Sequence, residues 1–369
     1  MKIERHIASS GYDRIRCWAN PVALPLGEEV LVLSQKLLIR AFDCFSEVSL
    51  FRSRDGGATW SAPEAVPALA DFAAPEGGRH AFLVSVMRRV AADRVLVLVT
   101  TFRYDRENRL DPASPQRVRY LYFCPSTGEW SESRELELAA DAADDVLAVD
   151  AQFVDAADGE LLLPYTVRRR VGSRLYSRIA RVRPEADGRL TVVDLSEPVV
   201  LEEGRGFLEP SLCRYGERYY LSLRNDRSGY VTASGDWKKF PAARPWCRVD
   251  GSSLGNYNTM TRLLAFGGKL HLVYTRKGLN NDHVFRHRAP LLIAEVDPER
   301  LAVLPETETV VVPEHGARLG NFTAVVRDPH HAYVSVAEWM QTLEPDHWNC
   351  RECEKYGAQN RIWYVTLES

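Results

Sequence analysis

The feature that most limits the fold of this chain is a repeated order of short β-type segments. Runs such as RVLVLVTTF, RYYLSLRN and HAYVSVAEW alternate with turn clusters such as YGER and FGGK at the spacing of hairpins. No segment sustains an apolar period of 3.6 residues over three helical turns, which excludes a helical core. The chain is therefore predicted to be all-β.

One structural unit recurs six times along the 369 residues. Each unit has an inner strand that enters a Gly or Asp turn, a strongly apolar second strand, and a third strand that ends in a hairpin. A unit of roughly 60 residues fits a four-stranded propeller blade, so we predict a single six-bladed β-propeller domain over residues 1–369. The last unit is short of one strand, and we expect the N-terminal KIERHI to supply it and close the ring. The units begin near Arg14, Arg79, Val146, Gly206, Gly255 and Leu319.

Composition excludes several classes of partner. Charged residues make up 26% and apolar residues 45% of the chain, with a formal net charge of -3, so there is no general attraction for nucleic acid or anionic membranes. The start, MKIERHIASSGYDRIR, lacks the apolar core of a signal peptide, and no later run has the length of a membrane helix. The 7 cysteines are odd in number and scattered, unlike a secreted disulfide framework. We expect a cytoplasmic protein with reduced thiols and neither a membrane nor a nucleic-acid partner.

The segment SRDGGATW, residues 53–60, has the pattern S-x-D-x-G-x-T-W of the Asp-box, or BNR repeat. On this box, and on the weaker echoes PSTGEW and ASGDW in later units, the chain resembles the sialidase superfamily of β-propellers. The resemblance implies a sialidase-like propeller in which the box lies on the blade periphery, away from the substrate. Each residue also suits a tight turn, since Asp55 can accept backbone N–H groups and the glycines tolerate positive φ. We therefore expect Asp55 to be structural.

The resemblance also implies a binding site for a carboxylate. Sialidases hold the substrate carboxylate with three arginines, because a guanidinium binds a carboxylate through two parallel hydrogen bonds. The first usually precedes the first inner strand, where YDRIRCW offers Arg14 or Arg16. The second follows a Glu-containing inner strand by about fifteen residues, and this spacing matches Glu209 and Arg224.

The third arginine of the resemblance precedes an apolar strand late in the chain. Arg288 matches this position, with Arg286 as the alternative, and both lie in NNDHVFRHRAP, the densest polar cluster of the sequence. Ligand sites of propellers form at one mouth of the central channel, from the ends of inner strands and the loops between blades. Asp150 and Gln152 are also predicted to point into the channel. The remaining predicted substrate contacts are Asn225, Asp226, Tyr257, His287 and Gln152.

The catalytic half of the resemblance is incomplete. A sialidase nucleophile is a Tyr that enters the last inner strand, where this chain has Asn321 and Phe322. The general-acid Asp has no clear match, and Asp43 is the nearest candidate. Glu209 either orients Arg224 or relays protons, although a Glu beside an Arg has a lowered pKa and is a poor acid. The residues predicted to handle protons are Glu209, Asp282, His283 and His80.

Three functions remain open. The first is an exo-acting glycoside hydrolase, sialidase-like, on a glycan with a sialic or uronic acid that arginines hold through its carboxylate. The second is a polysaccharide lyase directed at uronates, because a His or Tyr base beside a neutralised carboxylate can remove the adjacent proton. The third is a glycan-binding propeller without catalysis.

No cofactor is predicted. His283 and His287 have i, i+4 spacing, but no helix is expected there, which argues against a helical zinc pair. The segment HWNCREC places His347, Cys350 and Cys353 at a spacing that suits three zinc ligands, so the alternatives are a zinc site and ordinary loop thiols. The basic run at 168–174 is predicted to be an exposed hairpin that could attract an anionic glycan.

Overall fold

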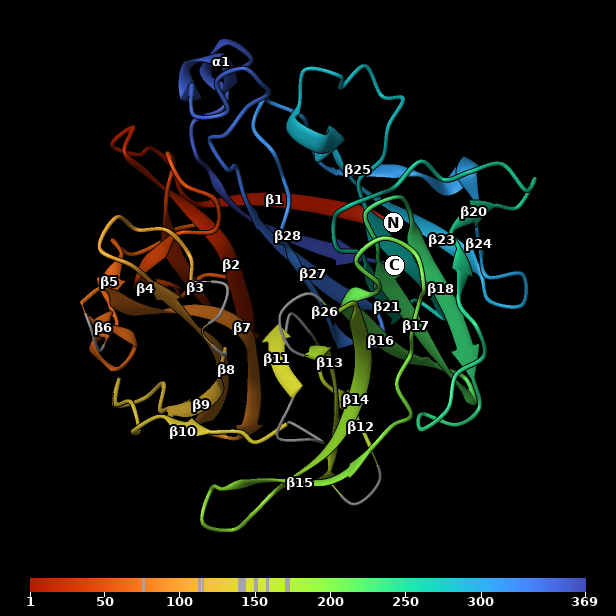
Figure 1. The fold of residues 1–369 in the computed structure, drawn as a ribbon, viewed down its shortest axis with the longest axis horizontal. Coiled ribbons are helices and arrows are strands. Elements are labelled where there is room, and N and C mark those ends of the chain that lie inside the picture. Colours follow the sequence, from red (N-terminus) through yellow and green to blue (C-terminus); the bar gives the residue numbers. More distant parts are fainter. Residues whose placement is uncertain are drawn as a thin grey trace.

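The computed structural model of the chain is a ring of six β-sheets (Figure 1). Each sheet is one blade, and its strands follow one another outward from the centre as antiparallel neighbours, apart from one short parallel pair in the fifth blade. The prediction of a six-bladed propeller is confirmed. The structure describes residues 1–74, 77–111, 114, 116–138, 144–148, 152–156, 159–169 and 173–369.

The first three blades cover the N-terminal half of the chain. Blade 1 contains β2 (Arg16–Leu26), β3 (Glu29–Leu38), β4 (Phe45–Ser53) and β5 (Glu64–Ala65). Blade 2 contains β6 (Phe72–Ala73), β7 (Arg79–Ala91), β8 (Arg94–Tyr104), β9 (Val118–Phe123) and β10 (Arg134–Glu135). Blade 3 contains β11 (Asp144–Ala148), β12 (Val154–Asp155), β13 (Leu161–Arg169), β14 (Leu175–Pro184) and β15 (Leu190–Leu195).

The other three blades complete the ring. Blade 4 contains β16 (Leu208–Tyr215), β17 (Arg218–Arg224), β18 (Gly229–Ser234) and β19 (Arg244–Pro245). Blade 5 contains β20 (Cys247–Arg248), β21 (Arg262–Phe266), β22 (Lys269–Tyr274), β23 (Leu291–Asp297), β24 (Ala302–Val303) and β25 (Thr309–Val312). Blade 6 contains β26 (Thr323–Asp328), β27 (His331–Ala337), β28 (Ile362–Glu368) and β1 (Lys2–Ser9). The helices of the described residues are α1 (Cys350–Lys355) and the 3-10 turns η1 (Pro67–Leu69), η3 (Phe285–His287) and η4 (Pro305–Thr307).

The N-terminal strand closes the ring, as the sequence predicted. β1 pairs antiparallel with β28, with Lys2 opposite Glu368 and His6 opposite Tyr364. The first strand of the chain therefore forms the outer strand of the last blade (Figure 1). Hydrogen bonding between the two ends of the chain covers the edge of β28 that would otherwise be exposed.

The core lies between neighbouring blades. The second strand of a blade is apolar on both faces because each face packs against a sheet, and β8 is buried at nearly every position. Leu33 of blade 1 and Val97 of blade 2 belong to one buried cluster, and Ile293 of blade 5 and Val334 of blade 6 belong to another. Burial between blades fixes their spacing and so positions the inner-strand ends. No helix in the described part of the chain is long and apolar enough to cross a membrane.

The Asp-box is a hairpin stabiliser between β4 and β5, as expected. Asp55 Oδ1 accepts the backbone N–H of Thr59 at 2.9 Å, and Asp55 Oδ2 accepts the Thr59 hydroxyl at 2.6 Å. These two bonds to Thr59, followed by one from Ser53, lower the pKa of Asp55 to about 2. Gly57 has φ +105°, and a Cβ there would lie 2.9 Å from the Tyr364 ring, so only glycine fits. Trp60 Nε1 donates to the Gly57 carbonyl at 2.8 Å and completes the turn.

Candidate functional site

The site begins with a buried ion pair between two strand ends of blade 4. Glu209 is the second residue of the inner strand β16, and Arg224 is the last residue of β17. Arg224 Nη1 donates to Glu209 Oε1, and both side chains are almost fully buried. The Glu209 backbone adopts a φ of +46° and its N–H donates to Thr166 Oγ1 at 2.9 Å. This tie to blade 3 fixes the carboxylate under the guanidinium.

Asn258 connects this pair to the third predicted arginine. Its side-chain oxygen accepts a hydrogen bond from Arg224 Nη2 at 2.7 Å, and its backbone oxygen accepts one from Arg288 Nη2. Asn258 lies in the loop before β21 and has a φ of +47°, a conformation that Asn tolerates better than most residues. One residue therefore holds two guanidinium groups in fixed positions.

A further arginine, Arg318, lies in the loop that leads into β26. Its guanidinium lies 4.1 Å from the centre of the Trp339 ring and 5.2 Å from that of Phe285. The side chain is buried, yet Arg318 Nε and Nη2 have no hydrogen-bond partner among the described residues. The aromatic rings stabilise its charge through cation–π contacts but leave these N–H groups free for a ligand.

These side chains form one electrostatic group, here called the arginine cluster: Glu209, Arg224, Arg286, Arg288 and Arg318. Burial, and then the charges of Arg224 and Arg318, lower the pKa of Arg288 well below the usual value. Burial lowers the pKa of Arg318 to about 10, with Arg286 and Arg224 acting in the same direction. The cluster therefore holds more buried positive charge than its single carboxylate can offset.

Glu209 is the counter-charge of the cluster. Burial alone would raise its pKa, but Arg224, through charge and hydrogen bond, and then Arg288 hold the pKa below the usual value. An ionised Glu209 orients Arg224 and has no proton to give at neutral pH. Of the two roles predicted for Glu209, the geometry favours orientation over acid catalysis.

Asp43 is an exposed acid beside the cluster, in the loop between β3 and β4. Its charge acts to raise the pKa of Arg318 and of Arg286. Asp226 is also near, and it pairs with Arg205 through contacts of 2.5 to 3.1 Å. Asp43 is thus the carboxylate beside the cluster that has no ion-pair partner among the described residues.

A phenol, an imidazole and a carboxylate form a chain next to the cluster. Tyr257 Oη lies 2.6 Å from His287 Nδ1, and His287 Nε2 lies 3.1 Å from Asp282 Oδ1. Burial raises the pKa of Tyr257, whereas the charges of Arg286 and Arg288 act in the opposite direction. The structure brings these predicted residues of the fifth unit together with Arg288.

Other predicted residues have different surroundings. His80 stacks on Phe72 at 4.8 Å, and burial, followed by the charge of Arg103, lowers its pKa. His283 stacks on Tyr356 at 4.1 Å and its Nε2 lies 3.0 Å from Glu314. Neither histidine contacts the arginine cluster in the part of the chain that the structure describes.

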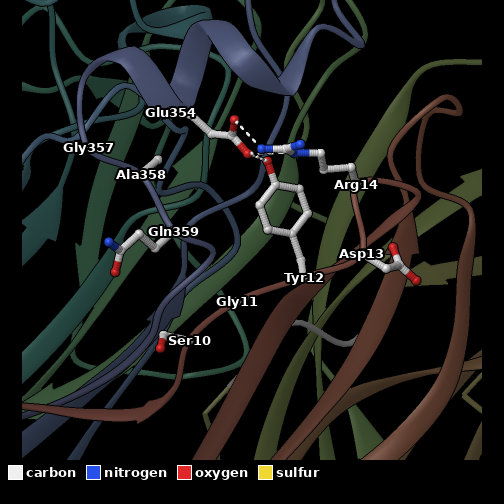
Figure 2. A pocket seen from close by; sticks show the side chains of 9 residues that line it. All are labelled: Ser10, Gly11, Tyr12, Asp13, Arg14, Glu354, Gly357, Ala358 and Gln359. Carbon is white, nitrogen blue, oxygen red and sulfur yellow. Dashed lines mark hydrogen bonds and ion pairs between the residues drawn. The ribbon is translucent and has the colours of Figure 1, made fainter.

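The two candidates for the first arginine form surface ion pairs. Arg14 pairs with Glu354 of α1 at 3.1 Å, and its side chain is 59% exposed. Arg14 and Tyr12 line a hollow of about 630 Å³ that does not include the arginine cluster, and Figure 2 shows both side chains there. Arg16 pairs with Glu47. Among the described residues, neither contacts Arg224 or Arg288, and Arg318 occupies the cluster instead. The backbone turn at Asp13, whose carboxylate accepts the N–H groups of Ile15 and Arg16, sets their direction.

Two predicted substrate ligands have structural contacts. Asn225 is fully buried, and its amide donates to the Gly206 carbonyl at 2.9 Å, which fixes the loop before β16. Gln152 bridges inner strands, since its amide donates to Leu263 O at 2.7 Å and its oxygen accepts the Ser211 hydroxyl at 3.2 Å. Gln152 borders a hollow of about 640 Å³ at the far ends of the inner strands, away from the arginine cluster. Asp150 lies outside the described residues.

The proposed zinc ligands do not converge. His347 Nδ1 lies 2.6 Å from the Thr342 carbonyl, and His347 Nε2 lies 2.7 Å from Glu344. Cys350 and Cys353 are buried on α1. The described residues contain no group of three His, Cys, Asp or Glu side chains that could hold a metal ion. Of the basic run, residues 170–172 lie outside the described part.

Sequence reasoning missed Arg318 and Asn258. Arg318 stands in HGARLGNF, shortly before the last inner strand, and a basic residue before an inner strand was the available signal. At the nucleophile position, Phe322 is buried in the core between blades 5 and 6. Phe322 therefore serves the core and offers no reacting group at this position.

Solved structures of sialidases share this architecture. The Trypanosoma rangeli sialidase in complex with the inhibitor DANA has a TM-score of 0.61 and 14% identity, and the similarity covers 96% of this chain and 55% of that one. The NanB sialidase of Streptococcus pneumoniae has a TM-score of 0.62 and 10% identity, and the similarity covers 98% of this chain and 70% of that one. The fold is that of the sialidase propeller. The chain spans little more than half of the T. rangeli enzyme, and identities this low establish the fold alone. No family model matches the sequence, and no curated protein matches it.

Proposed function

We propose that this chain is a carbohydrate-active enzyme that holds an acidic sugar of a glycan through the sugar's carboxylate. The observation that carries the proposal is the buried, under-compensated charge of the arginine cluster. Arg288 Nε, Arg318 Nε and Arg318 Nη2 are buried N–H donors without a partner among the described residues. Leaving buried charged donors unsatisfied is costly, so a ligand that supplies two anionic oxygens is favoured there.

The clamp in this proposal is Arg224, Arg288 and Arg318. Glu209 and Asn258 hold the first two in place, and the rings of Trp339 and Phe285 hold the third. A carboxylate is the anion we propose because a guanidinium fork matches its two oxygens, and the sialidase-like fold supports a sugar as its carrier. The predicted alternatives Arg14 and Arg16 are not part of this clamp.

Two reaction classes fit an acidic sugar held in this way. Hydrolysis at a chain end, the sialidase-like reaction, is supported by the shared fold and by Asp43, an acid beside the cluster that forms no ion pair with any described residue. Elimination from a uronate is the second candidate, and the specific observation that favours it is the 2.6 Å contact between Tyr257 and His287. A non-catalytic glycan-binding propeller would keep the clamp and show no turnover.

Calorimetric titration of the protein with D-glucuronate and with D-glucose tests the proposal. We expect binding of the acid and no measurable binding of the neutral sugar, because only the acid supplies a charge to the cluster. Arg288→Met should abolish this preference, and Arg300→Met, on an exposed turn, is the matched control. Equal affinity of the wild type for both sugars would reject the clamp.

A further inference from the structure

The chain of Tyr257, His287 and Asp282 has a defined direction. An ionised carboxylate only accepts hydrogen bonds, so the His287 Nε2 that lies 3.1 Å from Asp282 Oδ1 carries a proton. In the neutral imidazole the other nitrogen, Nδ1, is then an acceptor. The Tyr257 hydroxyl, 2.6 Å away, therefore donates its proton to His287 Nδ1. The three hydrogen-bonded groups are thus a reacting oxygen (Tyr257), a base (His287) and a group that orients the base (Asp282).

The loop that carries His287 is held in a strained shape. Arg286 and His287 have φ values of +55° and +52°, two consecutive left-handed residues of which neither is glycine. Buried Asn281 holds the loop closed, since its amide donates to the Ala289 carbonyl at 2.6 Å and to the Arg276 carbonyl at 2.9 Å. Strain of this kind persists where surrounding contacts enforce it and is concentrated at functional sites. Here it directs the imidazole toward Tyr257.

Tyr257 lies beside the clamp. It directly precedes Asn258, whose backbone oxygen accepts a hydrogen bond from Arg288 Nη2, and Lys277 Nζ lies 4.5 Å from the centre of the Tyr257 ring. A sugar whose carboxylate binds Arg288 would therefore present the carbon next to that carboxylate on the side of Tyr257. Neutralising the carboxylate with guanidinium groups makes the proton on this carbon more acidic, because negative charge develops there as the proton leaves.

The other residues that the sequence nominated for proton transfer or substrate binding are poorly suited to this step. Glu209 is bound to Arg224, Asp226 to Arg205, and His283 lies against Tyr356. Phe322, at the position where a reacting Tyr would enter the last inner strand, is buried. Tyr257 is the hydroxyl that combines contact with a base and proximity to the clamp.

We infer that Tyr257 is the proton-transfer residue of this site, with His287 as its proton acceptor and Asp282 as a positioning residue, in an elimination from a uronate. The inference rests on the proposed carboxylate clamp and names a substrate class for it: a uronate linked to the glycan through the oxygen on the second carbon from its carboxylate. This is the class of sugar that can form a double bond conjugated to the bound carboxylate.

The reaction balances without a co-reactant. The Tyr257 oxygen takes the proton from the carbon next to the carboxylate while its own proton passes to His287 Nδ1. The electron pair of the broken C–H bond forms a C=C bond, and the bond between the next carbon and the glycosidic oxygen breaks. Tyr257 then gives the proton that it took from carbon to the leaving glycosidic oxygen. His287 Nδ1 returns the original phenol proton to Tyr257, which restores both side chains. The products are an unsaturated uronate and a glycan with a new hydroxyl end.

The test uses the wild type, Tyr257→Phe and His287→Asn with alginate, polygalacturonate and hyaluronan as substrates. We expect the wild type to release products that absorb in the ultraviolet, and Tyr257→Phe to lose about 10²- to 10⁴-fold in kcat while D-glucuronate affinity is kept. Tyr219→Phe, on β17 at the end far from the cluster, and His330→Asn, on an exposed turn, are the matched controls. For the positioning residue, Asp282→Asn should lower kcat with little change in KM.

Three results would overturn the inference. These are sugar release without ultraviolet absorbance, full turnover by Tyr257→Phe, and absence of turnover on all three glycans by a protein that binds D-glucuronate. None of these results rejects the proposed carboxylate clamp. That proposal is rejected if D-glucuronate does not bind. The failure of the relay and the failure of the proposed function are therefore separable.

Discussion

Arg318 lies over the indole ring of Trp339, with its guanidinium 4.1 Å from the ring centre, and no carboxylate forms an ion pair with it among the described residues. Arginine buried against an aromatic face is stabilised by the ring but remains costly to desolvate. The cost is consistent with a side chain retained for ligand binding and not for stability.

Replacing Arg318 should separate stability from binding. Arg318→Met keeps the packing and removes a buried charge, so we expect the melting temperature to stay the same or to rise. The affinity for D-glucuronate should fall about 10- to 100-fold, the range for a lost charge-assisted hydrogen bond. Thermal unfolding and calorimetry measure the two effects. A lower melting temperature with unchanged affinity would make Arg318 a structural residue.

Glu209→Gln should destabilise the protein, because it leaves Arg224 buried without its counter-charge. Removing one partner of a buried pair costs about 3–5 kcal/mol. The pKa of Glu209 is lowered in the folded state, so its contribution is present above the unfolded pKa of about 4.3 and is lost as the pH falls through the folded pKa. The difference from wild type should therefore be largest near pH 7 and shrink in acid. The urea midpoints of unfolding of wild type and variant, at pH 7 and in acid, measure this difference. Glu217→Gln, on an exposed turn, should not change the midpoint at either pH.

Asp55 should matter for stability and not for ligand binding. Its pKa of about 2 reflects hydrogen bonds that only the folded hairpin provides. Because this pKa is lowered, the stabilisation is present above the unfolded pKa and disappears as the pH falls toward 2. Asp55→Ala should lower the melting temperature at pH 7 and leave D-glucuronate affinity unchanged. Glu64→Ala, exposed on β5, is the comparison, and a loss of affinity in Asp55→Ala alone would assign the box to the site.

His271 should give the stability a third pH dependence. It lies on β22 against Phe266, and burial, offset in part by Glu295, lowers its pKa to about 4. The unfolded chain binds a proton below about pH 6.5 that the folded chain rejects until about pH 4, so stability falls as the pH falls through this window, by up to about 3 kcal/mol. In His271→Leu, the free energy of unfolding should lose this slope between pH 6.5 and 4. An unchanged slope would show that His271 is not protected from protonation when folded.

The fold was readable from the sequence because its signals are local. Strand periodicity, hairpin turns and the Asp-box each depend on residues a few positions apart. The blade register that they define predicted the strand ends at which Glu209 and Arg224 lie. Ring closure by β1 followed from counting strands, since an unpaired edge is unfavourable.

The rest of the site depends on loop directions that spacing does not encode. Arg14 and Arg16 lie at the start of the first inner strand, but the turn at Asp13 directs them to surface acids. Arg318 enters the cluster because its loop packs between Trp339 and Phe285, a contact between residues distant in sequence. Gln152 and Asn225 are polar and central, yet their side-chain amide groups donate to backbone carbonyls. Polarity near an inner strand indicated candidate residues, and only tertiary contacts showed which of them are bound to backbone atoms and which lie in the arginine cluster.

A crystal structure of the protein with D-glucuronate tests the carboxylate clamp most directly. We expect the two carboxylate oxygens to lie within hydrogen-bonding distance of Arg288 and Arg318, with the sugar ring on the side of Tyr257. Glucuronate bound elsewhere, for instance in the hollow beside Tyr12 and Glu354, with the arginine cluster unoccupied, would contradict the account.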